Sequence, residues 1–143
     1  MNPNTQEDHH WQLAQSYVGR EYVPGHYDCA HLAIDVQREV FGRQIALPAC
    51  MAEHRLGRAG QAAQIRAASA ELATRVQEPV HGGAVLITTP VDTGLQWHIG
   101  TVFVRDAEVW VLHNSHTMGS ACLSRLRDFA WRGQRIEGFY AWK

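Results

Sequence analysis

Residues 28–42 read DCAHLAIDVQREVFG, and their spacing is that of an amphipathic helix. The apolar positions recur at the i, i+3, i+4 and i+7 intervals of a helix that buries one face: Cys29, Leu32, Ala33, Val36 and Val40. Asp28 is a good N-cap residue, and Gly42 is a typical stop signal after the last apolar position. The pattern therefore predicts a helix over residues 29–41, with its charged side chains toward solvent.

Cys29 lies in the first turn of this predicted helix, on its apolar face. Unpaired N–H groups and the helix dipole favour an anion there, which lowers the pKa of a thiol and raises the thiolate fraction at neutral pH. Two roles for Cys29 follow: a nucleophile, or a small apolar side chain of the core, since free cysteine is often fully buried. A nucleophile also needs a base, so a histidine within reach is what distinguishes the two roles.

The segments on either side of this helix differ in kind. An N-terminal helix is predicted from a cap at Asn4 or Thr5 to a stop at Gly19, and an alanine-rich helix over residues 58–76, before Pro79. Short apolar runs typical of strands follow over residues 83–89, 97–104, 108–113 and 135–142. No repeat or linker divides the chain. We therefore predict an α+β fold in which N-terminal helices pack on a C-terminal antiparallel β-sheet.

Length and composition limit the class of protein. The chain has 143 residues, of which 45% are hydrophobic and 19% charged, and its formal net charge is -1. We expect a single domain over residues 1–143 and no nucleic-acid partner. No apolar run approaches the roughly 20 residues of a membrane span. Three cysteines suggest reduced thiols, and the polar start MNPNTQEDHH lacks a secretory signal, so we expect synthesis in the cytoplasm.

The strands that flank RDAE, residues 105–108, are predicted to form a hairpin. A two- or four-residue loop centred on Asp106 and Ala107 gives three pairs: Val104 with Val109, Val102 with Val111, and Gly100 with His113. Side chains alternate along a strand, so His98 and His113 then share a face as diagonal neighbours. Gly100 leaves space for the imidazole. A three-residue loop would separate the histidines, but such loops usually need a glycine that RDAE lacks. The two rings are also compatible with a half-buried pair that has no catalytic role.

These segments together resemble the NlpC-type cell-wall cysteine peptidases. The resemblance covers about residues 14–142 and rests on AQSYVGREYV, DCAHLAIDVQREVFGRQIALP, HGGAVLI, HIGTVFV, VWVLHNS and IEGFYAW. Its strongest elements are Asp28 and Cys29 at a helix start and HIG at a strand start, with a second histidine ending the partner strand. RIEGFYAW and VQREVFG are most similar to the branch found in phage tail-assembly proteins and prophage relatives. The family is papain-like, so the resemblance implies a papain-like NlpC-type fold.

In that family a cysteine on a helix is the nucleophile, a strand histidine is the base, and a third polar residue orients the base. Matched by position, the resemblance implies these roles for Cys29, His98 and His113. Tyr22 matches a tyrosine that lines the family's active-site cleft, and we expect Asp28 and His31 to join it in substrate binding. The chain departs from the family pattern after the cysteine, where Ala30-His31 replaces Ser-Gly, and at Gly83, which replaces an aspartate.

The resemblance implies hydrolysis of peptidoglycan stem peptides by a Cys-His-His triad without a cofactor, commonly between D-glutamate and the following diamino acid. It also implies association with a phage tail and its tail-tip proteins. Two other functions stay open: a tail-assembly or structural role that keeps the peptidase fold, and amide hydrolysis or acyl transfer on a non-peptide substrate. His116 is an alternative to His113 as the third residue. No HExxH motif accompanies these histidines, so no metal is expected.

The remaining histidines, cysteines and tryptophans are given structural roles. Cys50 and Cys122 have neither a helix-start context nor an apparent histidine partner, so both are expected to be structural. His9 and His10 are expected to be solvated residues of the N-terminal helix. Four tryptophans are expected to pack in the core or the cleft: Trp97, Trp110, Trp131 and Trp142.

Overall fold

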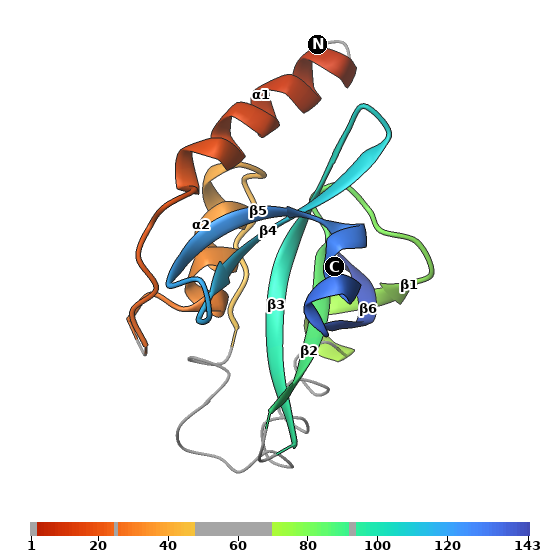
Figure 1. Ribbon diagram of the computed structural model, residues 1–143. Coiled ribbons are helices and arrows are strands. Elements are labelled where there is room, and N and C mark those ends of the chain that lie inside the picture. The colour runs from red at the N-terminus through yellow and green to blue at the C-terminus, as the bar shows by residue number, and fades with distance from the viewer. Residues whose placement is uncertain (1–2, 25, 48–69, 92–93) are drawn as a thin grey trace.

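A computed structural model describes residues 3–24, 26–47, 70–91 and 94–143 (Figure 1). In the described part of the chain, the helices α1 (Pro3–Tyr17) and α2 (Cys29–Glu39) precede a six-stranded antiparallel sheet. The strands are β1 (Ala73–Val76), β2 (Ala84–Val91), β3 (Gly94–Arg105), β4 (Glu108–Ser115), β5 (Ser120–Arg125) and β6 (Arg135–Trp142). Two short 3-10 helices, η2 (Leu126–Asp128) and η3 (Ala130–Arg132), connect β5 to β6. The predicted α+β class and the antiparallel sheet are confirmed.

The sheet has the order β1-β6-β2-β3-β4-β5. Strands β2 to β5 follow one another as neighbours. Strand β6 pairs with the other edge of β2, and β1 pairs with β6. Between β3 and β4, Asp106 and Ala107 both adopt a positive φ, of 50° and 62°. Two such residues make a type I′ turn, which matches the twist of a two-residue hairpin. The predicted pairing of Val104 with Val109 is confirmed.

The two faces of the sheet are covered differently. Helices α1 and α2 lie on one side of β3, β4 and β5, as Figure 1 shows. On that side, Leu32 and Val36 of α2 pack with Phe103 of β3 in a fully buried cluster. The opposite side is closed by the segment between β5 and β6, whose Phe129 packs against Val102 and other strand residues. Burial on both faces fixes the register of the central strands, because a one-residue slip would move every side chain to the opposite face and out of the cluster in which it packs.

Helix α2 begins where the sequence predicts. The Asp28 carboxylate accepts hydrogen bonds from the backbone N–H groups of Ala30 (3.0 Å) and His31 (3.1 Å). The His31 ring in turn accepts from the Asp28 N–H, which completes a capping box. The helix ends at Glu39, two residues before the predicted end, and Gly42 follows with a φ of 65°. Cys29 is therefore the first helical residue, as expected.

The alanine-rich helix predicted over residues 58–76 is wrong at its C-terminal end. Residues 58–69 lie outside the described part of the chain, and residues 70–72 are helical, but Ala73–Val76 is strand β1. There Ala73 pairs with Trp142 on the free edge of β6. Pairing with β6 gives hydrogen-bond partners to the backbone groups at the edge of the sheet. This gain outweighs the weak helix preference of a four-residue segment.

Two expectations about side chains are also wrong. Trp131, in the η3 connection from β5 to β6, is 88% exposed, whereas the other three tryptophans are half-buried against the core. His10 is buried rather than solvated. Its Nδ1 lies 2.9 Å from Nε2 of His81, and the edge of its ring meets Phe41. His10 therefore helps hold α1 against the body of the protein, while His9 remains exposed.

The His10–His81 contact requires both rings to be neutral. The Val104 N–H donates to His81 Nδ1 at 2.9 Å, so the His81 proton lies on Nε2 and points at His10 Nδ1. Burial, followed by the charge of the neighbouring histidine, lowers the pKa of both rings below 6.5. The unfolded chain therefore binds more protons in mild acid. The contact stabilises the fold fully above about pH 6.5, and this stabilisation is lost as the pH falls through the lowered pKa values.

We predict that His81→Asn makes the protein less sensitive to acid. Asn Oδ1 can still accept the Val104 N–H, but the side chain no longer titrates. The loss of unfolding free energy between about pH 7.5 and about pH 5, measured by chemical denaturation, should be smaller than in the parent. His26→Asn, at an exposed position, is the control and should leave this loss unchanged. An identical pH dependence in His81→Asn and the parent contradicts the assignment.

Candidate active site

The predicted histidine pair forms on the β3–β4 hairpin. His98 Nε2 and His113 Nδ1 lie 2.8 Å apart, and the two rings meet edge to face at 80°. Both side chains lie on the face that the helices do not cover, as the two-residue turn requires. Gly100 is needed mainly beside Val111: a Cβ there would overlap Val111 Cγ1, whereas His113 Cβ would lie at an ordinary contact distance of 3.4 Å. The prediction that these two histidines share a face is confirmed.

His113 has further partners on its other side. Its Nε2 lies 3.1 Å from the Ser124 hydroxyl and 3.3 Å from the Cys122 sulfur, both on β5. The Arg132 guanidinium donates to the same Ser124 oxygen at 3.0 Å. The expectation that Cys122 lacks a histidine partner is therefore wrong. Cys122 pairs directly opposite His113 in the sheet, a relation that no local sequence pattern indicates.

Cys29 lies beside these strands at the start of α2. It is 1% exposed and packs in a cluster with Ile99 and Trp97, the two residues that flank His98 in β3. The buried Asn114, next to His113, donates from its side-chain amide to the backbone carbonyl of Tyr27 at 2.9 Å. This hydrogen bond fixes the residues that lead into α2 against the end of β4. Adjacent residues of two strands thus hold the helix start on one face of the sheet and the histidine pair on the other, because Ile99 and His98 point to opposite sides of β3.

The electrostatics of the site favour neutral histidines. Removal from water lowers the pKa of His98 to about 4, and the nearby Asp28 carboxylate partly opposes this shift. Burial also lowers the pKa of His113 well below its ordinary value, with smaller contributions from His98 and Arg132. Both rings are therefore unprotonated bases at pH 7. Because His98 Nε2 faces His113, Nδ1 is the nitrogen through which His98 can exchange a proton with another group.

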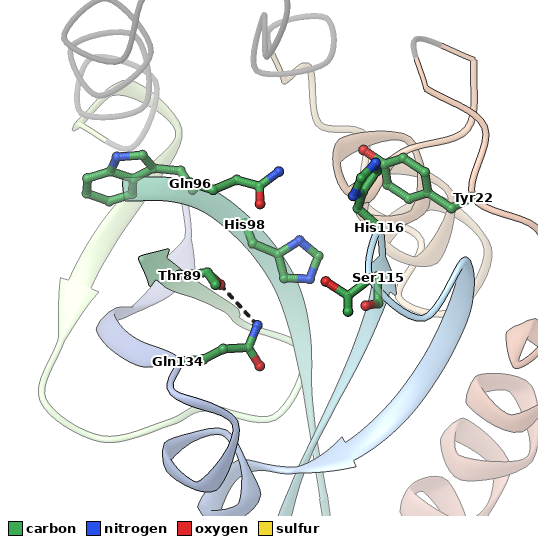
Figure 2. Close-up of a pocket in the computed structure, with 9 residues that line it drawn as sticks. Tyr22, Thr89, Gln96, His98, Ser115, His116 and Gln134 are labelled. Carbon is green, nitrogen blue, oxygen red and sulfur yellow. Dashed lines mark hydrogen bonds between the residues drawn. The ribbon is translucent and has the colours of Figure 1, made fainter. Parts of the chain in front are cut away.

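A polar pocket opens at His98 (Figure 2). It is lined by Tyr22, Thr89, Gln96, Trp97, His98, Ser115, His116, Thr117 and Gln134. Figure 2 shows the His98 ring between Gln96 and Ser115, with Tyr22 and His116 together at one side. The rings of Tyr22 and His116 meet edge to face, 5.3 Å between centroids, and Gln134 donates to Thr89 at 3.2 Å. Amides, hydroxyls and aromatic rings of this kind suit an uncharged polar ligand such as a peptide group.

Of the three predicted substrate-binding residues, one is among the described residues that line this pocket. Tyr22 lines it, whereas Asp28, Cys29 and His31 are not among its described lining residues. The Asp28 side chain is 1% exposed and caps α2. It therefore acts on the candidate site through its negative charge, which raises the pKa of His98. His31 is partly exposed and its Nδ1 lies 2.8 Å from the Asp28 carboxylate. For the third residue, the structure places His113 against His98, while His116 packs on Tyr22.

Sequence reasoning missed the residues behind His113 and most of the pocket lining. Ser124 and Cys122 belong to β5, a strand that was not predicted. Their i, i+2 spacing opposite a histidine would have identified them, had the second hairpin been recognised. Gln96 belongs to β3 and Gln134 directly precedes β6, so no local pattern joins them.

Comparison of the chain with models of protein families, with curated proteins and with solved structures found no match in any of the three. In the parts of the chain that the structure describes, no three His, Cys, Asp or Glu side chains are grouped to hold a metal ion. Among those same residues, no helix has the length and apolar character needed to cross a membrane.

We predict that a side chain at position 100 clashes with Val111, and that a smaller residue at position 111 relieves the clash. Gly100→Ala forces the new Cβ into Val111, a fully buried and stiff side chain, and should destabilise the fold by about 1–3 kcal/mol. Val111→Ala removes the overlapping methyl group. The double variant should therefore be more stable than the sum of the two single effects predicts, as measured by chemical denaturation. Simple additivity would mean that Gly100 and Val111 do not face each other.

Proposed function

We propose that this protein is a cysteine peptidase with a papain-like, NlpC-type fold that hydrolyses peptidoglycan stem peptides. The observation that carries the proposal is the 2.8 Å contact between His98 and His113, on strands held beside the N-terminus of a helix that begins with Cys29. A thiol at a helix start, a neutral imidazole and a residue that orients the imidazole are the parts that nucleophilic catalysis by cysteine needs. The identity of the substrate is inferred from the segments that resemble the family.

In the proposed reaction, His98 Nδ1 takes the proton of the Cys29 thiol. The resulting thiolate attacks the carbonyl carbon of the scissile amide, and the C–N bond then breaks as His98 returns the proton to the leaving amine. Water, activated by His98, hydrolyses the thioester and restores the thiol. The lowered pKa of His98, to about 4, means that its protonated form gives the proton up readily to the leaving group.

The start of α2 contributes to two steps of this reaction. The helix dipole favours negative charge on the Cys29 sulfur. Asp28 caps the N–H groups of Ala30 and His31, and its charge favours the protonated state of His98 that accompanies the thiolate. The backbone N–H of Cys29 is the natural donor to the oxyanion that forms during attack.

The pocket beside His98 supports a peptide as the substrate. Gln96 and Gln134 can each donate to and accept from a peptide group, and Tyr22 offers an aromatic wall. We propose that a stem peptide lies along this pocket with its scissile carbonyl toward Cys29. Delivery by a phage tail, with tail-tip proteins as partners, is the route that the resemblance supports.

We predict distinct effects for the three residues of the triad. Cys29→Ala and His98→Ala should abolish hydrolysis, because each removes a group that exchanges the reacting proton. His113→Asn should retain measurable turnover, since Asn Oδ1 can take the place of the Nδ1 that contacts His98. His113→Ala should lose about 10²-fold relative to the parent, within the range of a positioned acid–base partner. The assay is release of a new amino terminus from a purified stem peptide.

The matched control is His116→Ala, which should lose less activity than His113→Ala, with circular dichroism confirming that each variant folds. An inactive His116→Ala beside an active His113→Ala would assign the third role to His116. A folded parent that cleaves no stem peptide but does hydrolyse small amides or thioesters would favour the amidase or acyltransferase function. A folded parent that cleaves neither would favour a role in tail assembly.

A further inference from the structure

A second, larger cleft adjoins the pocket at His98. Its volume is about 510 Å³, and two of its lining residues, Trp97 and Gln134, also line the pocket at His98. Figure 2 shows Gln134 across that pocket from Tyr22 and His116, which is therefore the side on which the cleft continues. The rest of its lining includes Thr88, Pro90, Arg135 and Glu137.

The pocket at His98 accommodates only a small part of a peptide. Its volume is about 30 Å³, which admits one or two water-sized groups. A peptide whose scissile amide reaches this pocket must therefore extend beyond it, and the adjoining cleft has the size of an ordinary ligand site, about 300–1,000 Å³. The two spaces meet at Trp97, which precedes His98 in β3 and packs against the core cluster that contains Cys29.

The sheet places Arg135 in this cleft at a defined distance from the site. Arg135 of β6 pairs with Thr88 of β2, and Thr88 pairs with Trp97 of β3. Residues that pair directly point to the same face of a sheet, so these three side chains form a row across the three strands. Two strand spacings, roughly 10 Å, separate the ends of this row. That span corresponds to about three residues of extended peptide chain.

Arg135 is exposed, and its guanidinium is unpaired within the described part of the chain. Every other arginine there has a side-chain hydrogen-bond or ion-pair partner. Glu137, the other charged residue of the described lining, is already engaged. Its carboxylate accepts from the Tyr140 hydroxyl at 3.0 Å and lies 3.6 Å from the Arg75 guanidinium. The described part of the cleft therefore presents one unpaired positive charge.

We propose that this cleft extends the substrate site, and that Arg135 binds a carboxylate of the peptide about three residues from the amide that reaches His98. A guanidinium and a carboxylate form two parallel hydrogen bonds, which give the pair both strength and orientation. Trp97 offers an aromatic surface to the chain between these two points. That the ligand is a peptide rests on the proposed peptidase function, whereas the preference for a carboxylate rests on the cleft alone.

The binding of three matched peptides tests the proposal without requiring hydrolysis. Each is a stem pentapeptide (alanyl, γ-linked D-isoglutaminyl, lysyl and two D-alanyl residues) in which the glutamyl α-carboxyl is amidated. One is acetylated and ends in a carboxamide, the second ends in a free carboxylate, and the third has an N-terminal succinyl group. In Cys29→Ala, which removes the proposed nucleophile, calorimetry at low salt should show one carboxylate peptide binding about 5-fold tighter than the neutral one. The peptide that gains identifies the end of the chain that lies in the cleft.

Variants of Arg135 assign this gain to the cleft. Arg135→Gln should remove the gain and leave the Kd of the neutral peptide unchanged. Arg135→Lys keeps the charge but not the paired hydrogen bonds, so it should retain part of the gain. Arg127→Gln is the matched control, since it removes the same charge from an exposed arginine that pairs with Glu108, and it should leave the gain intact.

Equal affinities for the three peptides overturn the proposal, as does a gain that survives Arg135→Gln. Absence of binding by every peptide also overturns it, because the cleft then takes no peptide ligand. A gain that depends on Arg135, in a protein whose parent form hydrolyses none of the peptides, supports the carboxylate site and contradicts the peptidase function. Hydrolysis of all three peptides by the parent with the same kcat/KM does the reverse.

Discussion

The two-residue turn at Asp106 and Ala107 sets the register on which the site depends. With both residues at positive φ, β3 and β4 pair so that His98 and His113 lie on one face, and the absence of a Cβ at Gly100 leaves space for Val111 on that face. A shift of one residue would send one ring to each side of the sheet. Apolar side chains buried on both faces of the hairpin make such a shift costly, so core packing and the histidine contact enforce the same arrangement.

The site also carries a cost that the rest of the fold must offset. Burial holds two histidines neutral, so protonation in acid would oppose folding at the same place where the proposed reaction needs a base at neutral pH. The Asp28 carboxylate affects both the start of α2 and the protonation of His98. It caps α2, which fixes the position of Cys29, and its charge partly restores the basicity of His98. One buried carboxylate therefore serves both helix geometry and site electrostatics.

The parts that sequence reasoning found are those set by local chemistry. The cap at Asp28, the apolar spacing of α2 and the turn at RDAE each act within a few residues, so the helix start and the histidine pair could be predicted. The parts it missed depend on distant partners. Strand β1 forms because β6 offers a free edge, His10 is buried because it contacts His81, and Cys122 of β5 contacts His113 on the paired strand β4. Residues 48–69, which include Cys50, lie outside the described structure.

The central claim is that His98 exchanges a proton with Cys29, and the pH dependence of Cys29 alkylation tests it most directly. Limiting iodoacetamide and peptide mapping would give the rate at Cys29 from about pH 4 to about pH 10 in the parent and in His98→Ala. The account predicts that the parent rate levels off well below the ordinary thiol pKa of about 8.5, and that His98→Ala moves this midpoint upward. A midpoint near 8.5 or above in the parent, unmoved by His98→Ala, would contradict it.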